Sequence, residues 1–191
     1  MTQAFSTPIN SEIERLARNY INPVLSLSES EFALRLQVAG GAEGIAAGFK
    51  LKTPEIDEGS IVGTKKSTAQ KVEEYKQSST KSVTHLSITI KASGDVGLLA
   101  CRPTSGRRPP IEIIKEGPDL LFVIGYHEQT NDQAWEVVNT VKDILSDIED
   151  DLETLIPPIQ EEMVRKVEAK VRDIERDKAI EASITFPVKD G

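Results

Sequence analysis

The residues best placed to do chemistry are a cysteine and an arginine with five residues between them. Cys101 and Arg107 stand in the segment CRPTSGR, which follows an apolar stretch expected to be a strand. A thiolate beside an arginine and a loop of backbone amides can hold a phosphate and attack it. Pro109 and Pro110 then lead into strand-like IEII and not into a helix, so no helix N-terminus is expected to strengthen the loop's field.

This loop resembles the signature of the cysteine-dependent phosphatases, and the resemblance implies Cys101 as nucleophile and Arg107 as phosphate ligand. Two positions depart from that pattern. Ala100 stands where a histidine usually precedes the cysteine, and Arg108 stands where a hydroxyl residue usually follows the arginine. The sequence favours a buried cysteine at a strand end followed by a basic turn, so the phosphatase-like enzyme is the alternative to a non-catalytic role.

A second group of chemically active side chains is a run of carboxylates near the end of one expected helix. The dipole of a helix favours cations at its C-terminal end, so these acids are placed unfavourably. Three things could offset the cost: solvent and salt, the basic residues Arg165, Lys166 and Lys170 on a following helix, or a basic partner. We predict a partner-binding surface made of Asp143, Asp147, Glu149, Asp150, Asp151 and Glu153.

No metal or cofactor site is expected. His85 and His127 are the only histidines, and neither has a second imidazole or a carboxylate at the spacing of helical metal ligands. The acidic run lacks the spacing of an EF-hand loop. The segment GGAEG at 40–44 does not match the spacing of a nucleotide-binding glycine loop and is expected to be a hairpin turn.

The charge distribution bears on the kind of partner. The chain has 191 residues and a formal net charge of −8, and residues 131–156 alone carry eight acidic side chains and one basic side chain. A concentrated negative field selects basic partners and disfavours nucleic acid. The sequence shows no signal peptide and no apolar stretch long enough to span a membrane, and a single cysteine suits a reducing compartment. A cytoplasmic protein is therefore expected.

The first half of the chain predicts a mixture of elements. Apolar spacing predicts a helix over 9–22, ended by Pro23. Alternation predicts a strand from Phe32 to Val38 and another over 84–90, and 45–52 is expected to pair with the first of them. The polar segment 55–81 is expected to be a long surface loop with one short helix between Ser67 and Tyr75.

The second half predicts strands and then helices. A strand is expected over 96–101, and a hairpin over 111–115 and 120–126, turning at Gly117 and Pro118. The run Leu120 to Ile124 has no polar face and is expected to be buried on both sides. Apolar residues at heptad spacing then predict a helix, with the seam Val138, Val141, Leu145, Ile148, Leu152 and Leu155.

Pro157 and Pro158 are expected to end that helix and to begin a second, antiparallel one. The predicted fold class is α+β, with a mostly antiparallel sheet, an N-terminal helix and a C-terminal antiparallel helical pair. The expected division is a β-rich domain over 1–130 with the loop 55–81, a helical pair over 131–182, and a C-terminal strand or tail over 183–191. The heptad seam can be internal packing or a coiled-coil interface.

Residues 9–92 resemble, in the order and texture of their elements, the small trypsin-co-occurring domains of bacterial conflict systems. The resemblance rests on an amphipathic helix, FALRLQV, a glycine turn, GFKLK, a serine-rich excursion and THLSITIKA. It implies an accessory or interaction role and transfers no functional residue. The leading hypothesis is a non-catalytic interaction or assembly module that binds a protein partner or itself. A structural subunit of a larger bacterial or phage assembly is a further alternative.

Overall fold

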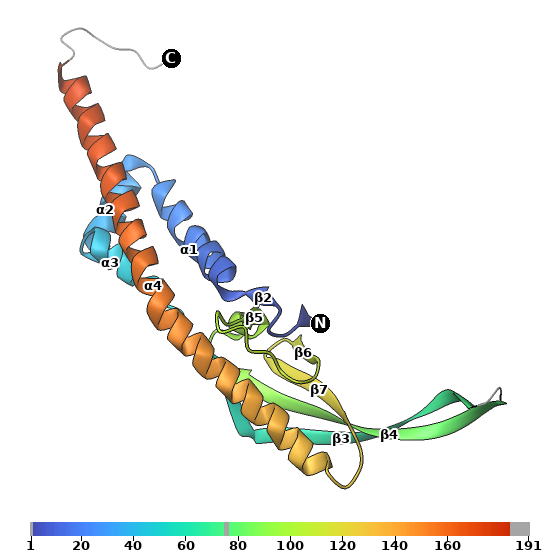
Figure 1. Cartoon of the computed structure of the whole chain (residues 1–191). Helices are drawn as coiled ribbons and strands as arrows, with labels where there is room; N and C mark the ends of the chain where they lie inside the picture. The colour runs from blue at the N-terminus through green and yellow to red at the C-terminus, as the bar shows by residue number, and fades with distance from the viewer. Residues whose placement is uncertain (1, 75–76, 184–191) are drawn as a thin grey trace. The chain divides into compact units, whose positions relative to one another are not determined.

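A computed structural model describes residues 2–74 and 77–183 (Figure 1). Contacts divide the chain into two compact units, and two of the three boundaries fall inside helices. The first unit contains the chain up to Glu12 and residues 51–152, and the second contains residues 13–50 and the chain from Glu153 onward. The protein is α+β, as the sequence predicts, with an antiparallel sheet and a long C-terminal helix.

The first unit is built on a five-stranded sheet with the order β1-β6-β7-β4-β3, in which all neighbouring strands are antiparallel. Its strands are β1 (Thr2–Gln3), β3 (Glu55–Glu74), β4 (Gln77–Ser93), β6 (Ile113–Glu116) and β7 (Asp119–Gly125). A second sheet pairs β2 (Thr7–Pro8) with β5 (Cys101–Arg102) in parallel. Between β1 and β2, Phe5 is a buried non-glycine residue with a positive φ of 54°.

The predicted hairpin at 111–126 is confirmed as β6 and β7. Glu116 pairs with Asp119 across a two-residue turn, in which Gly117 has φ 60° and Pro118 follows. A positive φ at the first central position together with proline at the second fits a type II′ turn, which matches the twist of the flanking strands. A Gly-Pro turn between two apolar segments therefore predicts this hairpin from the sequence.

The sheet buries one face much more completely than the other. Leu120, Phe122 and Ile124 of β7 are buried and share a face with Ile88 and Ile90 of β4. On the opposite face Val123 is 51% exposed, so the prediction that this strand is buried on both sides is wrong. The apolar run of β7 therefore exposes part of its hydrophobic surface to water, even though its sequence contains no polar face.

Strands β3 and β4 continue past the end of β7 as a two-stranded arm (Figure 1). β7 pairs with β4 only from His85 to Lys91, whereas β3 pairs with β4 as far as Glu74 and Gln77. We call Ser67–Glu74 with Gln77–Thr84 the hairpin arm. The predicted loop over 55–81 and its short helix are wrong, because the described parts of these polar, Thr- and Lys-containing segments, up to Glu74 and from Gln77, pair with each other across the two strands.

The segment expected to be a strand over 96–101 is mostly a 3₁₀ turn. Residues Val96–Ala100 form η1, and only Cys101 and Arg102 form a strand, β5. Leu98 and Leu99 are both buried, which the tight turn allows by pointing consecutive apolar side chains into the core. A strand would send them to opposite faces.

Helix α4 (Thr130–Ser183) replaces the predicted helical pair. Pro157 and Pro158 lie inside it and are exposed, so they interrupt its hydrogen bonds on the solvent side without ending it. Packing on either side outweighs the cost of the two prolines, because Leu152 is buried in the first unit and Met163 and Val167 are buried in the second. The seam residues Val138, Val141, Leu145, Ile148 and Leu152 are core residues, and Leu155 is half-buried.

The second unit contains most of α1 (Ile9–Leu25), α2 (Glu29–Ala39), α3 (Ala42–Ala47) and the second part of α4. The N-terminal helix is confirmed, although it continues through Pro23. The strands predicted over 32–38 and 45–52 are wrong. Phe32 is buried and Leu36 and Ala39 are half-buried, which is helical spacing, while Leu34 and Val38 are 61% and 73% exposed.

Polar contacts hold this helical unit together. Lys170 Nζ donates to the carbonyl oxygens of Leu25 (2.5 Å) and Leu27 (2.7 Å) and lies 4.5 Å from the centre of the Phe32 ring. Gln160 Nε2 donates to the carbonyl of Phe49 over 2.9 Å. The lysine thus places a cation at the C-terminal end of α1, which has no basic residue in its own last turn.

The predicted C-terminal strand over 183–191 lies outside the described residues, apart from Ser183, which ends α4. None of the described helices is both long and apolar enough to cross a bilayer.

Candidate functional site

The candidate site lies in the first unit, where the loop after β5 meets α4. The loop turns at once, because the amide of Gly106 donates to the carbonyl of Pro103 over 3.0 Å. Gly106 has φ 75°, in the left-handed region that glycine adopts at little cost. The loop therefore presents Thr104, Ser105 and Arg107 to one neighbouring element.

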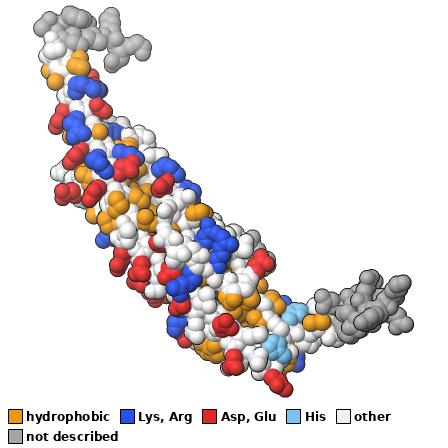
Figure 2. Space-filling model, viewed as in Figure 1, with side chains coloured by type: hydrophobic (Ala, Val, Ile, Leu, Met, Phe, Trp, Pro, Cys, Tyr) orange, Lys and Arg blue, Asp and Glu red, His pale blue; other side chains and the backbone are white. Residues whose placement is uncertain are grey.

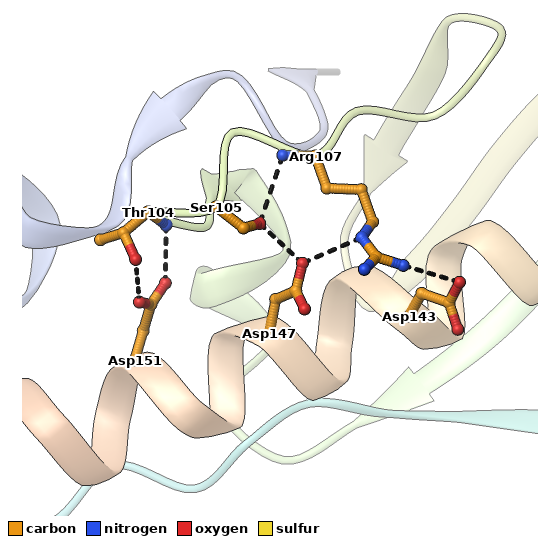
Figure 3. Close-up of polar contacts among 6 residues, drawn as sticks. All are labelled: Thr104, Ser105, Arg107, Asp143, Asp147 and Asp151. Atoms are coloured by element: carbon orange, nitrogen blue, oxygen red, sulfur yellow. Dashed lines mark hydrogen bonds and ion pairs between the residues drawn. The ribbon is translucent and has the colours of Figure 1, made fainter.

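That element is a stripe of three aspartates on α4. Asp143, Asp147 and Asp151 are spaced four residues apart, so they lie on one face of the helix. Figure 3 shows the three carboxylates pointing at the loop and the loop residues pointing back. The predicted acidic group is thus split, and half of it contacts another segment of the same chain.

Each aspartate holds a different part of the loop. The Arg107 guanidinium lies 2.7 Å from the Asp143 carboxylate and 3.0 Å from that of Asp147. Ser105 Oγ donates to Asp147 over 2.6 Å. Asp151 accepts from the amide of Thr104 over 2.8 Å and also from the Thr104 hydroxyl.

Burial differs along the stripe. The side chain of Asp143 is 61% exposed and that of Asp147 is 20% exposed, whereas the whole residue Asp151 is only 8% exposed. A buried carboxylate is costly unless hydrogen bonds satisfy it, and Thr104 supplies two of them. Because three carboxylates face a single guanidinium, the contact between the loop and α4 carries a net negative charge.

The other predicted acids, Glu149, Asp150 and Glu153, are exposed. Two of the basic residues expected to offset the acids have other partners. Lys166 pairs with Glu162 at 2.6 Å, and Lys170 donates to backbone carbonyls at the C-terminal end of α1. The cation that pairs with the acids of α4 is therefore Arg107. Arg107 lies in a loop far from α4 in the sequence, so the spacing of residues along a helix could not predict this contact. Figure 2 shows carboxylates and cations interspersed over the face in view.

Cys101 and Arg107 do not come together as a phosphate-binding pair. Cys101 is fully buried, and the Arg107 guanidinium is held by two carboxylates of α4. Two cavities adjoin this loop, and Cys101 lines neither of them. The buried cysteine at a strand end followed by a basic turn matches this arrangement.

The histidines lie apart from the loop. His85 is half-buried on β4, opposite Gly125 of β7. His127 is exposed before α4, and its Nδ1 accepts from the amide of Gln129 over 3.2 Å. Among residues 2–74 and 77–183, no three His, Cys, Asp or Glu side chains gather as metal ligands would.

Comparison of the chain with protein-family models, with curated proteins and with solved structures finds no match. Function must therefore be argued from the chain's own surfaces.

Proposed function

We propose that this protein is a non-catalytic protein-interaction or assembly module. The observation that carries the proposal is the hairpin arm, together with the free edge of β3. β3 is an edge strand of 20 residues whose only strand neighbour is β4. An exposed edge of that length offers a row of backbone donors and acceptors to a strand from another chain.

The arm is also unsupported within its own sheet. A two-stranded hairpin is marginally stable in water, and a third strand or a packed face normally stabilises it. The described side chains of the arm, at 67–69 and 82–83, are exposed, among them Val83 at 41%. Val62, further along β3, is 60% exposed and lies on the same face of the hairpin. A protein partner or a second copy of the chain would cover this face and extend the sheet.

The acidic surface of α4 supports the proposal less strongly than its charge count suggests. Asp143, Asp147 and Asp151 already hold the chain's own loop. The other three acids, Glu149, Asp150 and Glu153, are exposed, and a partner that contacted them would be basic. The partner-binding surface we favour is accordingly the β3–β4 hairpin, with these three acids as a second contact.

Two variants separate these surfaces. In the first, residues 69–82 are replaced by Asn-Gly, a two-residue hairpin turn that preserves the pairing of Thr68 with Val83. In the second, Glu149→Gln, Asp150→Asn and Glu153→Gln remove the exposed acids. The mass in solution at several concentrations and partner capture are measured for both variants and the wild type, with the fluorescence of Trp135, the one tryptophan, reporting folding of the first unit.

We expect the shortened arm to lose self-association or partner capture while the first unit stays folded. Association that survives in the shortened arm and disappears in the acid variant would assign the contact to α4 instead. A wild type that stays monomeric at every concentration and captures no partner would contradict the proposal.

The phosphatase-like alternative has less support, since its nucleophile is buried and its arginine is engaged. A structural subunit of a larger bacterial or phage assembly shares the hairpin arm with the favoured function, and a high-mass assembly formed by the wild type would favour it. The resemblance to the trypsin-co-occurring domains remains a prediction, and the accessory role that it implies agrees with an interaction module.

A further inference from the structure

Two cavities adjoin the loop after β5 in the first unit, and the same two arginines line both. The first cavity has a volume of about 480 Å³, and its lining includes Arg102, Arg108, Asn10, Thr104 and Gly106. The second has a volume of about 450 Å³ and adds Glu112 to the two arginines. The first cavity therefore carries two positive charges and no carboxylate in its lining.

These arginines differ from their neighbour in the loop. Arg107 is engaged by two aspartates, whereas in the described part of the chain neither Arg102 nor Arg108 makes an ion pair or a side-chain hydrogen bond. A guanidinium has five N–H donors in a rigid fork that matches the oxygens of a phosphate. Two such forks on one cavity form a site for an oxyanion.

The fold places Arg102 at the end of a parallel strand and Arg108 in the loop that follows it. β2 and β5 run side by side, with Pro8 opposite Arg102, and the chain after each strand lines the first cavity. Ligands of α/β sheets commonly bind beyond the carboxyl ends of parallel strands, where the following segments diverge. Asn10, on the first turn of α1, adds an amide side chain to the same cavity.

The aspartate stripe fixes the opposite side of this loop. Thr104, Ser105 and Arg107 bind the aspartates of α4, while Gly106 and Arg108 line the cavity together with part of Thr104. These contacts fix the backbone of the loop on both sides of Gly106, and Arg108 follows Arg107 directly. A loop backbone that is fixed before a ligand binds lowers the cost of binding.

We propose that the first cavity binds the phosphoryl group of a small molecule, with Arg102 and Arg108 as its ligands. A volume of about 480 Å³ suits a small metabolite. The site requires no chemistry at Cys101 and is independent of the hairpin arm, so it extends the proposed function without resting on it.

Isothermal titration with inorganic phosphate and with ribose 5-phosphate, at constant ionic strength set by chloride, tests the site in the full chain. We expect saturable binding of at least one probe, weakened about tenfold or more by Arg108→Gln, which removes charge-assisted hydrogen bonds. Arg102→Gln combined with Arg108→Gln should abolish binding, and Arg108→Lys should retain part of it. Arg35→Gln, an exposed arginine on α2, is the matched control and should bind as the wild type does.

Tighter binding of ribose 5-phosphate than of phosphate would identify an organic phosphate as the ligand, and equal binding would identify the free anion. The absence of saturable binding of both probes would overturn the proposal. So would binding that the Arg108→Gln variant leaves unchanged. Arg108 is exposed, so its substitution keeps the test valid even if Arg102→Gln impairs folding, which the fluorescence of Trp135 checks.

Discussion

Asp151 shows how a single side chain can be mistaken for a binding residue. Its sequence neighbours suggest a solvated acidic face, yet it is 8% exposed and its carboxylate holds Thr104. Asp151→Ala should lower the free energy of unfolding by about 2 kcal/mol, because it leaves the Thr104 amide without its partner. Urea unfolding followed by Trp135 fluorescence measures the change, and Glu149→Ala on the same helix should change it by less than about 0.5 kcal/mol. Equal effects of the two substitutions would contradict the structural role.

The reactivity of Cys101 is a second test at the residue scale. A fully buried thiol is protected from alkylating reagents, because they cannot reach it. Cys101 should therefore alkylate far more slowly in the folded protein than after denaturation in urea. Rapid labelling of the folded protein, slowed by phosphate, would revive the phosphatase-like alternative. Mass spectrometry after timed quenching measures both rates.

At the scale of elements, the second unit requires glycine where two helices meet. A Cβ at Gly44 of α3 would lie 1.7 Å from the carbonyl oxygen of Ala39 at the end of α2. Gly44→Ala should therefore destabilise the helical unit by about 1–3 kcal/mol, since backbone must move to make room. Gly97→Ala is the control, because no atom lies within 4 Å of its Cβ position. Far-UV circular dichroism during thermal unfolding should show a lower midpoint for the first variant alone.

Because α4 is continuous, replacing one of its prolines by alanine should stabilise the protein, in contrast to the substitution at Gly44. Proline in a helix interior costs about 3 kcal/mol relative to alanine, whereas proline in the first turn of a helix costs little. Pro158→Ala should raise the thermal midpoint if α4 is one helix. The helical pair predicted from the sequence would gain nothing from that substitution. An unchanged or lower midpoint would therefore favour the helical pair over the continuous helix.

The start of α2 gives the fold a small dependence on pH. The Ser28 hydroxyl and amide donate to the Glu31 carboxylate and lower the pKa of Glu31 from its ordinary value of 4.5. A lowered folded-state pKa means that the contribution is present above that ordinary value and is lost as the pH falls through the folded-state pKa. Glu31→Gln should lower the thermal midpoint at neutral pH, and this effect should disappear once the pH has fallen below the folded-state pKa of Glu31. A difference that persists at low pH would contradict this.

The elements that the sequence predicts correctly are those where two independent signals agree. Strand β4 alternates cleanly over 84–90, and β6 and β7 flank a glycine–proline turn. The segment FALRLQV fails because its apolar residues fit both periods. Helix and strand both place Phe32 and Leu36 on one face, but the helix leaves Leu34 and Val38 exposed, whereas a strand would have buried them on that same face. None of the described side chains of the hairpin arm, at 67–69 and 82–84, is buried, and the arm's polar sequence carries no apolar alternation to detect. The contact between Arg107 and the aspartates is non-local, and residue spacing cannot reveal it.

At the scale of the whole molecule, net charge opposes the association that the exposed sheet face favours. The formal charge is −8 at neutral pH and falls to zero near pH 4.9, where like-charged copies no longer repel each other. Self-association measured by light scattering should therefore increase as the pH approaches that value. Val62→Lys should suppress the increase by placing a charge on the exposed edge strand, whereas Ile180→Lys, at a comparably exposed apolar residue of α4, should suppress it less. If both variants scatter equally at every pH, the association does not use the hairpin, and the surface proposed for partner binding is wrong.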